Sequence, residues 1–134
     1  MDENIRPSGK TRAALAKAVL VIDDSDIDRQ VMLDLLTRAG YQVYDLPTAI
    51  GATRAAREVG ACAVVIDQNL PALNGAKLAA LFRSNPALKD IRVILISSND
   101  EATMATLTRE ARADAFVSKD RMHTDLVPTV RRLL

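Results

Sequence analysis

The chain has 134 residues, of which 49% are hydrophobic and 26% charged, and its formal net charge is +1. This composition is typical of one globular domain and excludes a disordered chain. The near-neutral charge argues against direct binding to nucleic acid or an anionic membrane, and no apolar run approaches the ~20 residues that span a bilayer. Because Cys62 is the only cysteine, no intrachain disulfide can form, and we expect a cytoplasmic protein.

Residues 1–18 are predicted to form a partly flexible N-terminal extension, followed by a single domain over residues 19–134. Within that domain, continuous runs of Val, Ile and Leu alternate with segments whose apolar residues recur every three to four positions. These patterns predict strands over residues 19–22, 41–44, 62–66, 91–96 and 115–117. They predict helices over residues 27–39, 49–59, 76–83, 100–112 and 124–134.

Local signals mark where some of these helices begin. Ser25 or Asp26 is expected to cap the first helix, and Thr48 the second. Pro128 is expected in the first turn of the last helix or just beyond it, where its missing N–H does least harm. Cys62 is expected to be a small buried hydrophobe, since it opens an apolar run.

Strict alternation of strands and helices predicts the α/β class, with a doubly wound, five-stranded parallel sheet covered by helices on both faces. Continuous apolar strands agree with this, because they are typical of strands buried on both sides. Binding sites in such sheets form beyond the carboxyl ends of the strands. The residues that follow the strands are therefore the candidates for function.

Acids and one base stand at those strand ends. Asp23 and Asp24 follow the first strand, Asp67 the third, Ser97 the fourth and Lys119 the fifth. A carboxylate at the end of a buried strand is costly unless a nearby group compensates it. If the strands lie side by side, these groups meet in one small site.

Three carboxylates at close range favour a hard divalent cation such as Mg²⁺, which prefers oxygen ligands and keeps several waters. The backbone of Asn69, two residues past Asp67, could supply a further oxygen. Capping of the next helix is the simpler reading of Asp23 or Asp24, but it does not explain Asp67. Lys119 is interpreted as the counter-charge to the acids rather than a solvated lysine.

Asp67 could act as a nucleophile, since carboxylates form acyl-phosphate intermediates. Mg²⁺ and Lys119 would neutralise the transferred phosphoryl group, and Ser97 could hydrogen-bond one of its oxygens. The sequence has no glycine-rich nucleotide loop, so the donor is expected to be another protein or a small phosphodonor. His123, the only histidine, is interpreted as a surface or capping residue.

Taken together, these residues resemble the receiver domain of two-component response regulators. The resemblance rests on five elements in order: Asp23-Asp24, Asp67 with Asn69-Leu70-Pro71, Gly75, Ser97-Ser98 and Lys119. It spans residues 19–134 and implies a flavodoxin-like (βα)5 fold with strand order 2-1-3-4-5.

The resemblance implies that Asp67 is the phosphoacceptor, with Lys119 and Ser97 beside it. It implies Mg²⁺ bound by Asp24, Asp67 and the Asn69 carbonyl, with Asp23 helping directly or through water. Ser97 and Phe116 would be the switch residues, although Phe116 could equally be core packing. Such a protein catalyses only its own phosphorylation and dephosphorylation.

The implied partners are a histidine kinase or phosphotransfer protein and an output protein that binds the 100–134 face. Neither nucleic acid nor a membrane is expected to bind directly, and a monomer or weak dimer is expected. The family often has Pro after the lysine; here Asp120 follows Lys119, so a trans bond is expected. Ser98 replaces a commoner Ala or Gly. Two alternatives remain: a receiver-like interaction module that works without phosphorylation, and a small phosphoester hydrolase.

Overall fold

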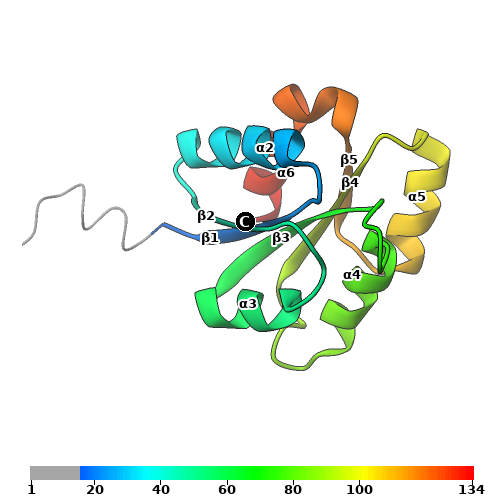
Figure 1. Ribbon diagram of the computed structural model, residues 1–134, viewed down its shortest axis with the longest axis horizontal. Helices are drawn as coiled ribbons and strands as arrows, with labels where there is room; N and C mark the ends of the chain where they lie inside the picture. The colour runs from blue at the N-terminus through cyan, green and yellow to red at the C-terminus, as the bar shows by residue number, and fades with distance from the viewer. Residues whose placement is uncertain (1–15) are drawn as a thin grey trace, which may run out of the picture.

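The computed structural model describes residues 16–134, so residues 1–15 of the expected extension lie outside the described part. Five parallel strands form one sheet in the order β2-β1-β3-β4-β5, which confirms the predicted topology (Figure 1). The strands are β1 (Ala18–Ile22), β2 (Gln42–Leu46), β3 (Ala61–Asp67), β4 (Arg92–Ser97) and β5 (Ala115–Ser118). The helices are α2 (Asp26–Arg38), α3 (Ala52–Val59), α4 (Gly75–Ser84), α5 (Glu101–Glu110) and α6 (Met122–Leu133), with a 3-10 turn η1 (Lys119–Arg121).

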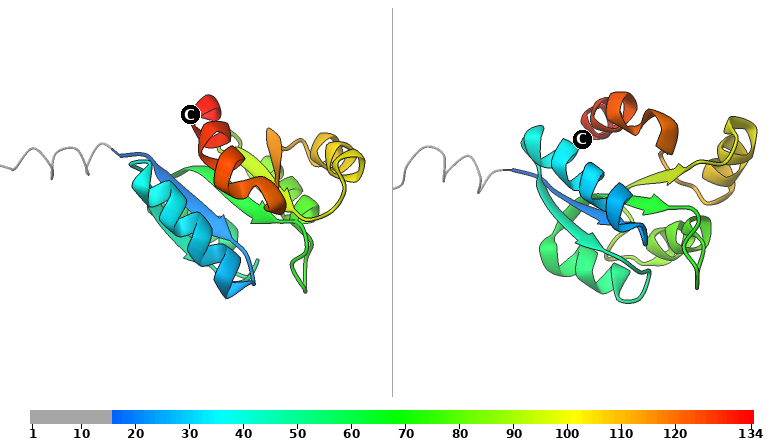
Figure 2. Two further views of the ribbon diagram at one scale, coloured as in Figure 1. Left: turned by 90° about the horizontal axis from the view of Figure 1, so that it is seen from above. Right: turned by 45° about the horizontal axis from the view of Figure 1, so that its top comes forward.

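The sheet separates two apolar cores. Val19 and Val21 of β1 pack into the core under α2 and α6, whereas Leu20 and Ile22 pack into the core under α3, α4 and α5. Figure 2 shows the same division, with α2 and α6 together on one side of the sheet. Every residue of β1 is buried, which explains why its sequence is apolar without alternation.

Three local predictions were wrong. The chain makes an extra turn before α3, so Thr48 accepts a hydrogen bond from the amide of Ile50 instead of capping the helix. Helix α6 begins two residues earlier than predicted, which puts the exposed Pro128 in its interior. Cys62 is only half-buried, because β3 starts at the amino edge of the sheet, where its first two residues are partly open to solvent.

The trans bond after Lys119 and the surface position of His123 agree with the sequence predictions. No peptide bond among residues 16–134 is cis, so Lys119 joins Asp120 in trans. None of the helices formed by these residues is long and apolar enough to cross a membrane. The exposed position of His123 on α6 agrees with its interpretation as a surface residue.

The strand register brings the candidate residues together. Ile22 pairs with Ile66, Asp67 with Ile96, and Ser97 with Ser118. The residue that follows each of these positions therefore emerges at the same edge of the sheet. In this way four segments far apart in the sequence deliver their polar groups to one place.

Candidate functional site

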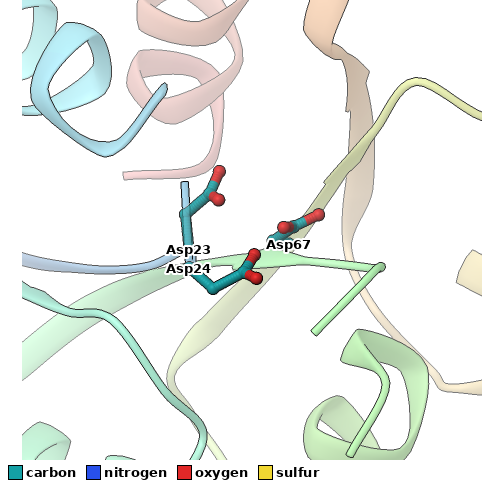
Figure 3. Close-up of side chains that lie close together, drawn as sticks. All are labelled: Asp23, Asp24 and Asp67. Carbon is teal, nitrogen blue, oxygen red and sulfur yellow. The ribbon is translucent and has the colours of Figure 1, made fainter. Parts of the chain in front are cut away.

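Three carboxylates group at the carboxyl edge of the sheet, as Figure 3 shows. Ligand oxygens of Asp23, Asp24 and Asp67 lie within 4.8 Å of one another. Asp23 and Asp67 are buried, with 0% and 2% of their surface exposed, whereas Asp24 is open to solvent. The site therefore has a buried floor of two acids and one acid at its mouth.

Asp67 is held by its own loop. The backbone amide of Asn69 donates to Asp67 Oδ1 at 3.0 Å. Burial raises the pKa of Asp67 from 3.8 to about 6, and the neighbouring Asp23 carboxylate acts in the same direction, while the Asn69 amide and the Lys119 ammonium act against it. Near neutral pH the carboxylate is therefore ionised but poorly stabilised by its surroundings.

Asp23 is hydrogen-bonded through one carboxylate oxygen and ion-paired through the other. Its Oδ1 accepts from the amide of Ser25 at 2.9 Å, and its backbone carbonyl accepts from the Arg29 guanidinium at 2.8 Å. Its Oδ2 is buried and receives no hydrogen bond from residues 16–134, although the Lys119 ammonium lies 3.1 Å away. Ser25, not Asp23, caps α2, since the Ser25 hydroxyl accepts from the amide of Asp28. Helix capping by its side chain therefore does not account for Asp23.

Lys119 points into the acidic cluster, as predicted for a counter-charge. Its Nζ lies 3.1 Å from Asp23 Oδ2 and 3.4 Å from Asp67 Oδ2. Burial alone would lower the pKa of Lys119, but the carboxylates of Asp28, Asp23 and Asp67 outweigh that effect and raise the pKa above its usual value. The ammonium is thus permanently charged near neutral pH.

Sequence reasoning missed Asp28, the third residue of α2. Its Oδ2 accepts a hydrogen bond from Lys119 Nζ at 2.9 Å, the shortest of the three contacts between Lys119 and a carboxylate. The available signal was its place in the first helical turn after the paired acids, which starts at the same edge of the sheet. Position alone did not show which way the side chain would turn.

Ser97 lies beside this cluster and is fully buried. Its Oγ accepts hydrogen bonds from the Asn69 side-chain amide at 3.1 Å and from the backbone amide of Asn99 at 3.0 Å. Asn69 was predicted to contribute only its backbone, so this side-chain contact is an addition. The two bonds connect the loop after β3 to the end of β4.

Gly75 explains how closely α4 approaches the loop. A Cβ at this position would lie 2.6 Å from the Asp67 carbonyl oxygen and 2.8 Å from Gln68 Cα, so no side chain fits. The Gly75 amide donates to the Gln68 carbonyl, and the Ala76 amide donates to the Gln68 side chain. The buried Gln68, which sequence reasoning also missed, therefore joins the start of α4 to the end of β3.

Phe116 is partly buried against the core beneath α5. It borders two hollows on the surface formed by α5, β5 and α6. One, of about 400 Å³, includes Arg109 and Arg132 in its lining, and the other, of about 280 Å³, includes Ser98 and Asp120. A third hollow, of about 410 Å³, lies at the opposite edge of the sheet beside Cys62.

The donor set fits a hard divalent cation. Asp23 and Asp67 share the Lys119 ammonium with Asp28, and Asp24 lies beside them at the mouth of the site. The buried Asp23 Oδ2 receives no hydrogen bond from residues 16–134. A cation with oxygen ligands would satisfy that oxygen and relieve the repulsion among the acids. Asp23, Asp24 and Asp67 are the described residues that could hold it.

Comparisons with known proteins agree with this geometry. The family model described as "Response regulator receiver domain" matches residues 19–131. The two-component response regulator ORR7 of Oryza sativa subsp. japonica is 28% identical over 121 residues, which cover 87% of this chain and 56% of the relative. The chain thus spans little more than half the length of that relative.

Solved structures show the same fold. The chemotaxis protein CheY4 of Vibrio cholerae aligns with a TM-score of 0.82 at 22% identity, covering 89% of this chain and 99% of that chain. The receiver domain of the sensor histidine kinase PA1611 from Pseudomonas aeruginosa aligns with a TM-score of 0.79 at 20% identity, covering 88% and 97%. The PA1611 structure is described as having a magnesium ion coordinated in its active site cleft.

Proposed function

The chain belongs to the response regulator receiver domain family, and we propose that it accepts a phosphoryl group on Asp67 from a histidine kinase or a phosphotransfer protein. One observation carries this proposal. Asp67 is a buried carboxylate with a raised pKa, and it lies beside the acids Asp23 and Asp24 and the Lys119 ammonium. That arrangement suits a nucleophile whose product is stabilised by cations.

In the transfer, an Asp67 carboxylate oxygen attacks phosphorus as the bond from phosphorus to the donor's nitrogen or oxygen breaks, and the donor leaves with that electron pair. Asp23, Asp24, Asp67 and the Asn69 carbonyl are the residues that would hold Mg²⁺, which supplies charge neutralisation for the phosphoryl oxygens. The Lys119 ammonium neutralises a further oxygen, and the Ser97 hydroxyl, after release from its present partners, donates to another. The protein thereby catalyses only its own phosphorylation and dephosphorylation.

The output is a change of the 100–134 face. Movement of Ser97 toward the phosphoryl group would alter the hydrogen bonds that it now accepts from Asn69 and Asn99. Phe116, partly buried between two surface hollows, is the side chain placed to respond on that face. The hollows give an output protein two places to insert side chains next to the ring. We place this protein in the cytoplasm as a monomer or weak dimer that binds neither nucleic acid nor membrane directly.

A phosphotransfer screen against histidine kinases tests the acceptor, with Asp67→Asn as the negative variant and Asp34→Asn as the matched control. Asp34 is an exposed acid of α2 whose carboxylate accepts a hydrogen bond from Gln30 and has no other hydrogen-bond partner among residues 16–134. Label is expected on the wild type and on Asp34→Asn, and none on Asp67→Asn. Label that persists on Asp67→Asn contradicts the proposal.

Beryllofluoride with Mg²⁺ tests the output independently of any kinase. Amide NMR shifts are expected at the site and along the 100–134 face of the wild type, but not of Asp67→Asn. A chain that stays inert to acetyl phosphate and beryllofluoride would favour the alternative, an interaction module that works without phosphorylation.

A further inference from the structure

The Lys119 ammonium makes its shortest contact with Asp28, which the sequence analysis did not place in the site. Lys119 Nζ donates to Asp28 Oδ2 at 2.9 Å. It lies 3.1 Å from Asp23 Oδ2, which nevertheless receives no hydrogen bond, and 3.4 Å from Asp67 Oδ2. In this resting arrangement, the ammonium is drawn toward α2 and away from the proposed phosphoacceptor.

Helix capping does not account for this contact. The Asp28 backbone amide donates to the Ser25 hydroxyl, so the helix start is already satisfied without the Asp28 side chain. Among residues 16–134, Lys119 is the only cation paired with Asp28, although the two are 91 positions apart. Arg29, the next residue of α2, turns to Asp26, Asp45 and the Asp23 carbonyl instead.

The Asp28 contact is also the easiest of the three to exchange. The Asp28 side chain is 28% exposed, compared with 0% for Asp23 and 2% for Asp67. Water can replace the ammonium at a partly exposed carboxylate, whereas an abandoned buried carboxylate stays unsatisfied. The Lys119–Asp28 bond is therefore the one that gives way when a new anion enters the site.

We propose that Asp28 is a positioning residue that holds Lys119 on the α2 side of the resting site and competes with a phosphoryl group on Asp67 for the same ammonium. The competition rests on the phosphoacceptor role proposed for Asp67. By this device the chain limits how tightly it retains a phosphoryl group. Weakening the Asp28 contact should therefore strengthen binding of a phosphoryl mimic.

The first test measures the dissociation constant of beryllofluoride with Mg²⁺ by NMR for the wild type, Asp28→Asn and the control Asp34→Asn. Asparagine keeps the shape of the side chain but loses its charge. Asp28→Asn is expected to lower the constant about three- to tenfold, the range for a hydrogen bond weakened by partial exposure to solvent. Asp34→Asn is expected to match the wild type. An unchanged or higher constant in Asp28→Asn overturns the proposal.

The second test examines the resting protein without Mg²⁺ or beryllofluoride. A hydrogen-bonded Lys119 ammonium should give a slowly exchanging side-chain NMR signal, assigned by its loss in Lys119→Arg. The signal is expected to disappear in Asp28→Asn and to remain in Asp34→Asn. If the signal is absent from the wild type, or survives in Asp28→Asn, the proposal that Asp28 positions Lys119 is wrong. A wild type that binds no beryllofluoride refutes the phosphoacceptor role instead, and this signal still decides whether Asp28 holds Lys119.

Discussion

Two charged clusters lie at opposite edges of the sheet. At the amino edge, the Arg83 guanidinium bonds to the carbonyls of Arg112, Lys89 and Ile91 and to the Asp114 carboxylate. That carboxylate also accepts from the amide of Val93 at 2.8 Å. At the carboxyl edge, Asp23, Asp28 and Asp67 share one ammonium, and Asp23 Oδ2 has no hydrogen bond.

The hydrogen-bonded cluster at the amino edge fits a structural role, whereas the cluster at the carboxyl edge fits the proposed binding role. Hydrogen bonds that are all made within the chain stabilise the fold and leave nothing for a ligand to do. Buried charge that is left incompletely paired destabilises the folded state until something binds. Arg83 joins the end of α4 to the starts of β4 and β5, whereas Lys119 lies in the site that we propose binds a further cation.

The largest expected effect is at the amino edge. Arg83→Ala should lower the free energy of unfolding by about 3 kcal/mol, because it removes a hydrogen-bond donor from the Asp114 carboxylate and from three backbone carbonyls. Urea unfolding measures it. The control Arg54→Ala removes an exposed pair with Glu58 and should cost at most about 0.5 kcal/mol. If both variants lost the same free energy of unfolding, the Arg83 cluster would stabilise the fold no more than the exposed Arg54–Glu58 pair does.

At the carboxyl edge, removing a charge should raise the free energy of unfolding instead of lowering it. Asp67 has a pKa of about 6 in the folded state against 3.8 when free. The folded state therefore keeps a proton that the unfolded chain loses, and stability falls as pH rises between these values. Asp67→Asn should be more stable than the wild type by roughly 3 kcal/mol at pH 7 and nearly equal to it at pH 3. A variant less stable at pH 7 would show that the Asp67 charge is fully compensated.

A bound metal ion should also stabilise the folded state, because it would offset the repulsion among the buried acids. At a free Mg²⁺ concentration 100 times the dissociation constant, mass action stabilises the wild type by about 2.7 kcal/mol. Thermal unfolding with and without Mg²⁺ measures this gain. Asp24→Asn should lose most of it, and Arg92→Gln, an exposed change at the amino edge, should keep it. Equal gains in both variants would place the cation elsewhere.

The smallest effect should come from Ser97→Ala, at about 1 kcal/mol. The change leaves the Asn69 side-chain amide and the Asn99 backbone amide without their acceptor. Ser84→Ala, which removes an exposed hydroxyl from α4, should be near neutral. If the two serine variants unfold alike in urea, the loop after β3 is not held through Ser97.

The sequence predicted most of the fold because the three central strands, β1, β3 and β4, are buried along most of their length. Burial of all of β1, and of β3 beyond its first two residues, leaves continuous apolar runs that need no tertiary knowledge to recognise. The acids at their ends were found because polar residues interrupt each apolar run at the end of its strand, although Asp23 and Asp67 are themselves buried. The extra turn before α3 and the early start of α6 lay beyond these signals, because turn geometry decides both.

Contacts between distant segments were not predictable in the same way. Lys119 meets Asp28 across 91 positions, and Arg83 meets Asp114 across 31. Each pair depends on how a helix packs on the sheet and which way its side chains turn. The turn of the Asn69 side chain toward Ser97 is of the same kind. Proximity at a sheet edge was predictable, whereas the choice of hydrogen-bond partner was not.

The start of α4 is attached closely to the loop after β3. The amides of Gly75 and Ala76 fasten the first turn of α4 to Gln68, and Gly75 lies against the Asp67 carbonyl with no space between them. The first turn of α4 and the strand that bears Asp67 are therefore expected to move as one rigid unit. Under the proposed phosphorylation of Asp67, we therefore expect the change to spread through Ser97 at the end of β4, which bonds the Asn69 side chain, rather than through the start of α4.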